Sequence, residues 1–375
     1  MDTEYLKKMK KIQKRILNYI DQKDDSEDDL PNIKKILDNS KFLENKHDFI
    51  IILYFIINVS NNHHRGPNFF HKIDMILSQL KSCINNFFSN SEIFYIFESN
   101  KRVLLFLFEE KIISIDQHIY DEIKKRDSYE EYFQPEIQDF SNDLNKKETE
   151  TDFALKRKAG ENDDYICKLI RNDSVEEFIS HMQRTNFPIN GRIPNSIFET
   201  NFYINCKYYL PSLIEYAAFF GSLQIFQYLK MQGAKLEKEI WYSAVHSNNP
   251  ELIHLLEENH VKFPKEMWTS KDIKYVWPIK ESIRCYHNDI AKYILNAYSS
   301  DGNKRDEMEK IISVSIENYN FAFIEETIDF DISYSFYYFC TCNYYSIVDF
   351  LVEKGIDVNK KVILAFFCLN GVYII

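Results

Sequence analysis

The stretch SLIEYAAFFGSLQIFQYLKMQGAKL, residues 212–236, contains two short apolar segments on either side of a glycine. Apolar residues recur in it at intervals of three and four, which is the spacing of one face of an α-helix. Gly221 and Gly233 close the two segments, and glycine suits the left-handed conformation that ends many helices. We therefore predict a helix hairpin. A hairpin this short cannot bury its own apolar edge and needs similar neighbours to stack on.

The same layout recurs along the second half of the chain. In residues 239–261, Asn248 stands in the position of Gly221, and His260 stands in the position of Gly233. Asparagine is the usual second choice for a left-handed turn. Further copies cover residues 277–295 and 335–359, and weaker ones cover residues 166–182 and 312–328. A chain built from such copies is expected to fold as a stacked array.

This layout resembles the ankyrin repeat. Residues 212–236 match its paired alanines, Ala217 and Ala218, its two glycines and the apolar positions of its second helix. Residues 346–359, SIVDFLVEKGIDVN, match the exit of the repeat. The resemblance implies an all-α fold, an α-solenoid of stacked helix hairpins (divergent ankyrin repeats) preceded by a helical N-terminal region. Arrays of this kind present a long concave surface to another macromolecule.

A second resemblance covers nearly the whole chain. Segments such as NNHHRGPNFF and ICKLIRNDSVEEFI resemble an expanded protist family in which a helical N-terminal region of unknown function precedes divergent ankyrin repeats. This resemblance implies no known activity. The hypothesis that the first region consists of degenerate ankyrin-like hairpins rests on residues 99–116, in which Lys111 stands where the glycine is expected.

The domain organisation follows from changes in composition. We expect a helical N-terminal region over 1–125, a charged linker over 126–163, divergent repeats over 164–359, and an incomplete repeat or apolar tail over 360–375. The linker is rich in charge and poor in branched apolar residues. The apolar tail predicts either a truncated array or a segment that folds back as a lid.

The composition narrows both the fold class and the partners. The 375 residues include 8 glycines and 9 prolines, too few for the many tight turns of a β-sandwich or barrel. The net charge of −11 argues against non-specific nucleic-acid binding, which relies on basic residues. No apolar run reaches the roughly 20 residues that span a bilayer. The charged N-terminus lacks the apolar core of a signal peptide, so we expect a cytoplasmic chain, with a nuclear location left open by the basic residues 156–158.

The sequence lacks the short motifs of nucleotide-binding proteins, serine hydrolases and zinc metalloproteases. Its 7 cysteines are widely spaced, as in a reduced chain. His63, His64 and His71 form the densest histidine group, but Asn and Pro residues predict a surface loop there, and no cysteine or acid completes a ligand set. We predict no catalytic residue, no metal site and no cofactor.

Binding of an unknown protein partner is therefore the expected function. In ankyrin-type units, the loop before the first helix and the outer side of that helix line the concave face. The corresponding candidates, with the aromatic residues of the insert 262–278, are Glu215, Phe219, Phe220, Tyr242, His246, Ser247, Trp268, Tyr275, Trp277, Lys280, Arg284 and Tyr337. These aromatic side chains either contact the partner, as Trp and Tyr often do, or pack beneath their own loop. The alternative function is a substrate-recognition adaptor of an enzyme complex, with residues 1–125 docking the catalytic partner.

Overall fold

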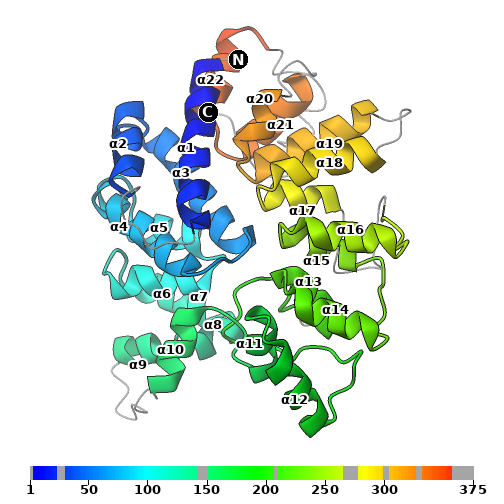
Figure 1. The fold of residues 1–375 in the computed structure, drawn as a ribbon. Helices are drawn as coiled ribbons and strands as arrows, with labels where there is room; N and C mark the ends of the chain where they lie inside the picture. The colour runs from blue at the N-terminus through cyan, green and yellow to red at the C-terminus, as the bar shows by residue number, and fades with distance from the viewer. Residues whose placement is uncertain are drawn as a thin grey trace. The chain divides into compact units, whose positions relative to one another are not determined.

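The computed structural model describes residues 3–22, 30–141, 151–206, 210–264, 278–298, 304–326 and 332–356, and the statements below concern these residues. They form 22 α-helices and no β-strand, with one isolated bridge between Arg192 and Ser212 (Figure 1). The predicted all-α fold class is confirmed. No described helix is both long enough and apolar enough to span a membrane. The predicted tail over 360–375 lies outside the described residues.

The chain divides into two compact units that do not follow the chain order. Unit 1 combines Met1–Asn58 with Ala291–Ile375, and unit 2 comprises Val59–Ile290. The chain passes from unit 1 to unit 2 within helix α3 (Lys46–Asn62) and returns to unit 1 within helix α18 (Asn288–Tyr298). The boundaries that the composition predicts near residues 125 and 163 lie inside unit 2.

Unit 1 packs the first helices of the chain against the last ones. Helix α1 contacts both α2 and α20, and α19 contacts α20 and α21. A buried glutamine links α1 to α20: Gln13 Nε2 donates to Asn320 Oδ1 at 3.1 Å, and Gln13 Oε1 accepts from the Phe321 backbone N–H at 2.8 Å. The helices of unit 1 besides α3 and α18 are α1 (Thr3–Asp21), α2 (Leu30–Ser40), α19 (Lys304–Glu317), α20 (Phe321–Glu326), α21 (Ile332–Thr341) and α22 (Tyr345–Glu353).

Unit 2 is a succession of mostly short helices, many of them joined by short turns, with a long loop between α12 and α13 (Figure 1). Its first part consists of α4 (Phe69–Phe87), α5 (Asn90–Phe97), α6 (Lys101–Glu109), α7 (Gln117–Lys124), α8 (Asp127–Tyr132), α9 (Gln134–Ser141) and α10 (Thr151–Ala159). Its second part consists of α11 (Tyr165–Arg171), α12 (Val175–Thr185), α13 (Leu213–Phe220), α14 (Leu223–Met231), α15 (Ile240–His246), α16 (Pro250–Glu258) and α17 (Pro278–Arg284).

One turn geometry recurs between paired helices. After most first helices a residue takes a left-handed conformation, and the next N–H bonds to a carbonyl five residues back, as in the Schellman motif. Ser222 N donates to Ala217 O at 2.9 Å, and His287 N donates to Ser282 O at 2.8 Å. The left-handed residues at such turns are Asp173, Gly221, Tyr286, Tyr319 and Asn343, and Lys111 has the same geometry at the end of α6. Asn248 is also left-handed, but the next N–H donates to the Ser247 hydroxyl at 3.2 Å. The prediction that Asn248 and Lys111 take the place of a turn glycine is confirmed.

The first helices of successive hairpins stack on one another. Helix α13 contacts α11 and α15, α15 contacts α17, and α12 contacts α14. The small residues Ala217, Ala218 and Ala244 are fully buried on these stacked helices. Small side chains allow the backbones of α13 and α15 to approach closely, and the apolar residues of α13 are covered by α11 and α15.

The predicted linker, residues 126–163, contains α8, α9 and α10. Residues 142–150 are not among the described residues. Arg157 is buried there, and its guanidinium lies 5.3 Å from the Phe153 ring and 5.7 Å from the Tyr132 ring. Its Nη1 also donates to Glu136 at 2.7 Å. Cation–π contacts and an ion pair therefore hold a segment that is poor in branched apolar residues.

Replacing the left-handed Lys111 with glycine is expected to stabilise the chain. Lys111 is exposed with φ 53°, and a left-handed conformation costs roughly 1–2 kcal/mol for a residue with a Cβ. We expect Lys111→Gly to raise the free energy of unfolding by about 1 kcal/mol in denaturant titrations. The matched variant Lys168→Gly, at an exposed position inside α11, is expected to lower it by about the same amount. A destabilising Lys111→Gly would contradict the turn geometry.

Candidate functional site

Four of the residues predicted to bind a partner are buried in unit 2. Glu215 is the third residue of α13, and its carboxylate accepts from the Ser212 N–H at 2.7 Å in a capping box. Phe219 is 2% exposed and stacks on His246, with ring centroids 3.6 Å apart. Tyr242 is 5% exposed. These side chains have partners inside the protein, and their role in binding stays a prediction.

The remaining predicted residues are more accessible or lie outside the description. Phe220, Ser247, Lys280 and Arg284 are half-buried in unit 2, and Tyr337 is half-buried in unit 1. The Arg171 guanidinium lies 5.9 Å from the centre of the Phe220 ring. Trp268, Tyr275 and Trp277 fall outside the described residues.

The loop before α13 packs over Phe219 and Tyr242. Tyr203, from this loop, stacks on Tyr242 with ring centroids 3.6 Å apart and lies parallel to Phe219 at 6.0 Å. Backbone hydrogen bonds within the loop are supplemented by Asn205, whose side chain donates to Ser196 O at 2.8 Å. The surface available to a partner here is therefore formed by the loop itself.

A buried ion pair fastens this loop to the start of unit 2. Arg65 Nη1 lies 3.0 Å from Glu199 Oε1, and both side chains are at most 5% exposed. Glu199 also accepts from the backbone N–H groups of Asn162, Thr200 and Asn201 at 2.8 to 3.1 Å. A buried carboxylate is tolerated when its oxygens are satisfied in this way.

A second buried set, the Glu281 network, consists of Glu281, Arg284, His246, Tyr242 and Cys285. Glu281 lies 2.6 Å from Arg284 Nη2 and accepts from His246 Nδ1 at 2.8 Å. Arg284 also donates to the Tyr242 hydroxyl, and the Cys285 thiol donates to Asn62 O at 2.8 Å. The network joins α15 to α17 and both to residue 62.

The charges in this network keep Glu281 ionised. Burial alone would raise the pKa of its carboxyl group, but the Arg284 charge and the His246 hydrogen bond outweigh burial and lower the pKa to about 2. Burial lowers the pKa of His246 despite Glu281, so the imidazole is neutral at pH 7. Burial raises the pKa of Cys285 well above its usual value, so the group is a thiol and not a nucleophilic thiolate.

A pocket of about 560 Å³, the Lys101 pocket, opens between the start of α6, α8 and the loop before α13. Its size falls in the range of small-ligand sites. Most of the lining residues have a polar side chain, while apolar atoms form the larger part of the lining surface. The lining includes Lys101, Ser128, Tyr129, Asn195, Asn205 and Phe202. Phe202 is 73% exposed, so a large aromatic side chain stands at the pocket in contact with solvent.

Lys101 is the unusual group in this pocket. The residue is 7% exposed, and its ammonium lies 5.2 Å from the centre of the Tyr132 ring. Burial lowers the pKa of Lys101 to about 8, although Glu199 and Glu131 oppose the shift. It is also the first residue of α6, where the helix dipole is positive and favours an anion. Both features favour a negatively charged group in the pocket.

Comparisons with known proteins do not identify a family for this chain. No family model matches the chain, and no curated protein or solved structure matches it. The resemblance to ankyrin repeats and to the protist family therefore stays a prediction, and the site has to be interpreted from its own chemistry.

Sequence reasoning named Tyr242, His246 and Arg284 of the Glu281 network as candidates, but it missed Glu281 and Lys101. Glu281 lies one position before the small residue Ser282 in a predicted first helix, where a carboxylate has no turn or cap to serve. Lys101 follows a predicted loop and precedes a run of apolar residues, which is a signal for a helix start but not for a buried cation. A charged residue inside a predicted first helix was the signal available for Glu281, and no such signal marked Lys101.

Proposed function

We propose that the chain is a non-catalytic interaction scaffold of stacked, ankyrin-type hairpins that binds a protein partner. The partner docks where the loop before α13 meets the Lys101 pocket. This position agrees with the expected concave face, which in such arrays includes the loop before the first helix. The pocket receives an acidic side chain or the terminal carboxylate of the partner.

The observation that carries this proposal is the buried cation of the Lys101 pocket. The Lys101 ammonium lies 5.2 Å from the centre of the Tyr132 ring, and the pocket opens to the surface. A carboxylate that enters would form a charge-assisted hydrogen bond with this largely buried ammonium. The exposed Phe202 beside it supplies the large apolar contact typical of an interface hot spot.

A measurement of partner capture tests the proposal. Proximity labelling in the native cell, with the full chain as bait, identifies the partner, and purified proteins then give its affinity. We expect Phe202→Ala to weaken binding by about tenfold or more, in line with the loss of a hot-spot aromatic residue. The matched variant Met231→Ala, 75% exposed on α14, is expected to bind normally. Equal affinities for the two variants would contradict the proposed docking surface.

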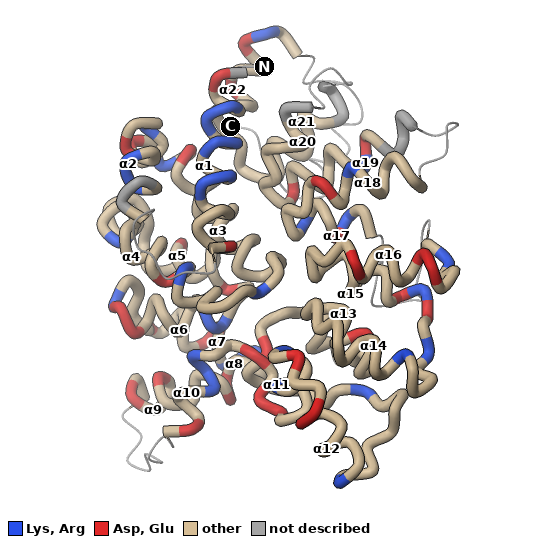
Figure 2. The backbone as a smooth tube through the Cα atoms, viewed as in Figure 1, with Lys and Arg blue, Asp and Glu red and all other residues tan. Residues whose placement is uncertain are grey.

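A second candidate function is the adaptor of an enzyme complex, and one observation favours it. Five exposed basic residues lie on one side of α1 in unit 1, within about 120° of its circumference at 100° per residue. They are Lys7, Lys8, Lys11, Lys14 and Arg15, and Figure 2 shows the repeated basic positions along α1. In a chain of net charge −11, this basic face gives unit 1 its own site for an acidic partner.

Charge reversal separates the two functions. If the chain is an adaptor, the double variant Lys11→Glu/Arg15→Glu should lose one partner and keep the partner that requires Phe202. The control Lys34→Glu/Lys35→Glu changes the net charge by the same amount at two exposed positions of α2. Retention of every labelled protein by the α1 variant would contradict the adaptor function and leave the simple scaffold.

A further inference from the structure

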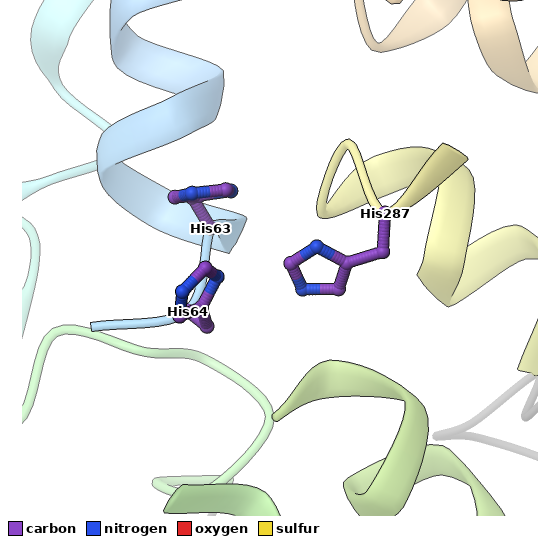
Figure 3. Close-up of side chains that lie close together, drawn as sticks. All are labelled: His63, His64 and His287. Carbon is purple, nitrogen blue, oxygen red and sulfur yellow. The ribbon is translucent and has the colours of Figure 1, made fainter. Parts of the chain in front are cut away.

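Two consecutive histidines, His63 and His64, meet the distant His287 inside unit 2. His63 and His64 follow the end of α3, and His287 lies in the turn between α17 and α18 (Figure 3). The ring centroids are 4.4 Å apart for His63 and His64, 5.4 Å for His63 and His287, and 5.0 Å for His64 and His287. One ligand nitrogen from each ring lies within 4.8 Å of the others.

Hydrogen bonds to backbone carbonyls fix two of the three rings. His63 Nδ1 lies 2.7 Å from Cys285 O, and His287 Nε2 lies 3.0 Å from His246 O. Because a carbonyl only accepts, both nitrogens carry the proton in the neutral rings. Nε2 of His63 and Nδ1 of His287 are then the nitrogens with the lone pair. Metal-binding histidines characteristically donate their other N–H to a carbonyl in this way.

The position of His287 in its hairpin accounts for the hydrogen bond made by Nε2, but it does not account for Nδ1. It follows the left-handed Tyr286, as Ser222 follows Gly221 in an earlier hairpin. Ser222 Oγ donates to Ile170 O, in the first helix of the preceding hairpin, and His287 Nε2 donates to the equivalent helix at His246 O. A serine is enough for this structural hydrogen bond. The imidazole adds a second nitrogen on the side of His63 and His64.

The side-chain chemistry of this cluster suits a metal ion, because one ligand nitrogen of each of the three imidazoles lies within 4.8 Å of the others. Three protonated imidazoles this close would repel one another, whereas a divalent cation would attract three neutral ones. Imidazole is a ligand of zinc, copper and nickel.

We propose that His63, His64 and His287 form a binding site for a divalent transition metal ion, zinc(II) foremost, with a fourth position for water. A tetrahedral zinc ion at about 2.0–2.1 Å from each nitrogen separates the ligand nitrogens by roughly 3.4 Å, so the rings need to close by at most about 1.4 Å. His64 is half-buried, which leaves a path for the ion and the water. The ion joins residues 63–64 to residue 287 and closes unit 2 over more than two hundred residues. This site is independent of the proposed function.

A neighbouring group of ligand types provides the competing assignment. His246, Glu281 and Cys285 also lie within 4.8 Å of one another. Glu281 is already paired with Arg284 at 2.6 Å, and a cation there would have to displace this charge. The histidine cluster, not the Glu281 network, is therefore the site that a metal ion occupies.

Metal titration of the full chain tests the proposal. After removal of metal by a chelator, zinc chloride or cobalt chloride is added at micromolar concentrations. We expect one ion per chain, a higher melting temperature with zinc, and visible bands of tetrahedral cobalt without a thiolate charge-transfer band. His64→Gln and His287→Gln should each weaken binding by at least about tenfold. His254→Gln, on the exposed side of α16, and Cys285→Ser should leave both affinity and spectrum unchanged.

The possible contrary results are distinct. No ion retained at micromolar metal, or full binding by a folded His64→Gln variant, would overturn the site. A cobalt–thiolate band that disappears in Cys285→Ser would assign the ion to the other group and would also overturn it. If His287→Gln fails to fold, His64→Gln decides the question, because His64 is half-buried and neither of the two backbone hydrogen bonds described above is made by it.

Discussion

Glu281→Ala is expected to lower the free energy of unfolding by about 3–5 kcal/mol, the usual cost of removing one partner of a buried ion pair. The variant leaves Arg284 without the carboxylate 2.6 Å away, and it leaves the buried His246 Nδ1–H without its acceptor. Urea titration followed by circular dichroism measures the change. Glu251→Ala, at an exposed position of α16, serves as the matched control and should change stability by less than about 0.5 kcal/mol.

The same residue predicts a dependence on acid. The folded-state pKa of Glu281 is about 2, below its ordinary value of 4.5. A group with a lowered folded-state pKa stabilises the protein above its unfolded pKa and loses that contribution as the pH falls toward the folded value. The wild-type chain should therefore lose stability between pH 4.5 and about 2 more steeply than Glu281→Ala. Parallel pH profiles for the two proteins would contradict the network.

Lys101→Met is expected to make the protein more stable and less able to bind its partner. Burial of the ammonium costs stability at pH 7, and methionine of similar length removes this cost, so the free energy of unfolding should rise by about 1–3 kcal/mol. Loss of a hydrogen bond to a charged group, worth about 1.5–3 kcal/mol, should weaken partner binding by roughly 10- to 100-fold. Opposite signs for stability and binding are the mark of a residue kept for function.

The pH dependence of this variant has a defined sign. The folded-state pKa of Lys101 is about 8, below its ordinary 10.5. Between these values the unfolded chain binds the proton and the folded chain does not, so wild-type stability rises with pH relative to the variant. The advantage of Lys101→Met should be complete below pH 8 and should disappear above pH 10.5. The control Lys168→Met, on the exposed side of α11, should alter neither stability nor binding.

The repeat pattern predicted the local structure well because turns are determined locally. A left-handed position requires glycine or a residue that tolerates the strain, and the spacing from Gly221 led directly to Asn248, as the spacing of the second helix that ends at Gly233 led to Lys111. Helix type and the buried Ala217 followed from the same pattern. Such signals depend on a few neighbouring residues, so one sequence suffices to detect them.

The candidate site could not be predicted in this way because its contacts join distant parts of the chain. The loop before α13 was expected to line an open face, yet Tyr203 stacks on Tyr242 and buries it. His63 and His287 meet only because unit 2 brings its first and last segments together. No periodic sequence pattern predicts these long-range contacts. Likewise, nothing in the sequence near Lys101 indicates that its ammonium is buried beside the Tyr132 ring.

Site-specific photo-crosslinking tests the central claim most directly. A photoreactive phenylalanine analogue replaces Phe202 in the full chain, or Met231 as the control, and the protein is irradiated in its native cell. Phe202 lines the Lys101 pocket, whereas Met231 is equally exposed on α14. We predict a discrete crosslinked protein from position 202 only, and its loss when Lys101→Met is added. The same crosslinks from both positions, or crosslinks that persist with Lys101→Met, would contradict partner binding at this pocket.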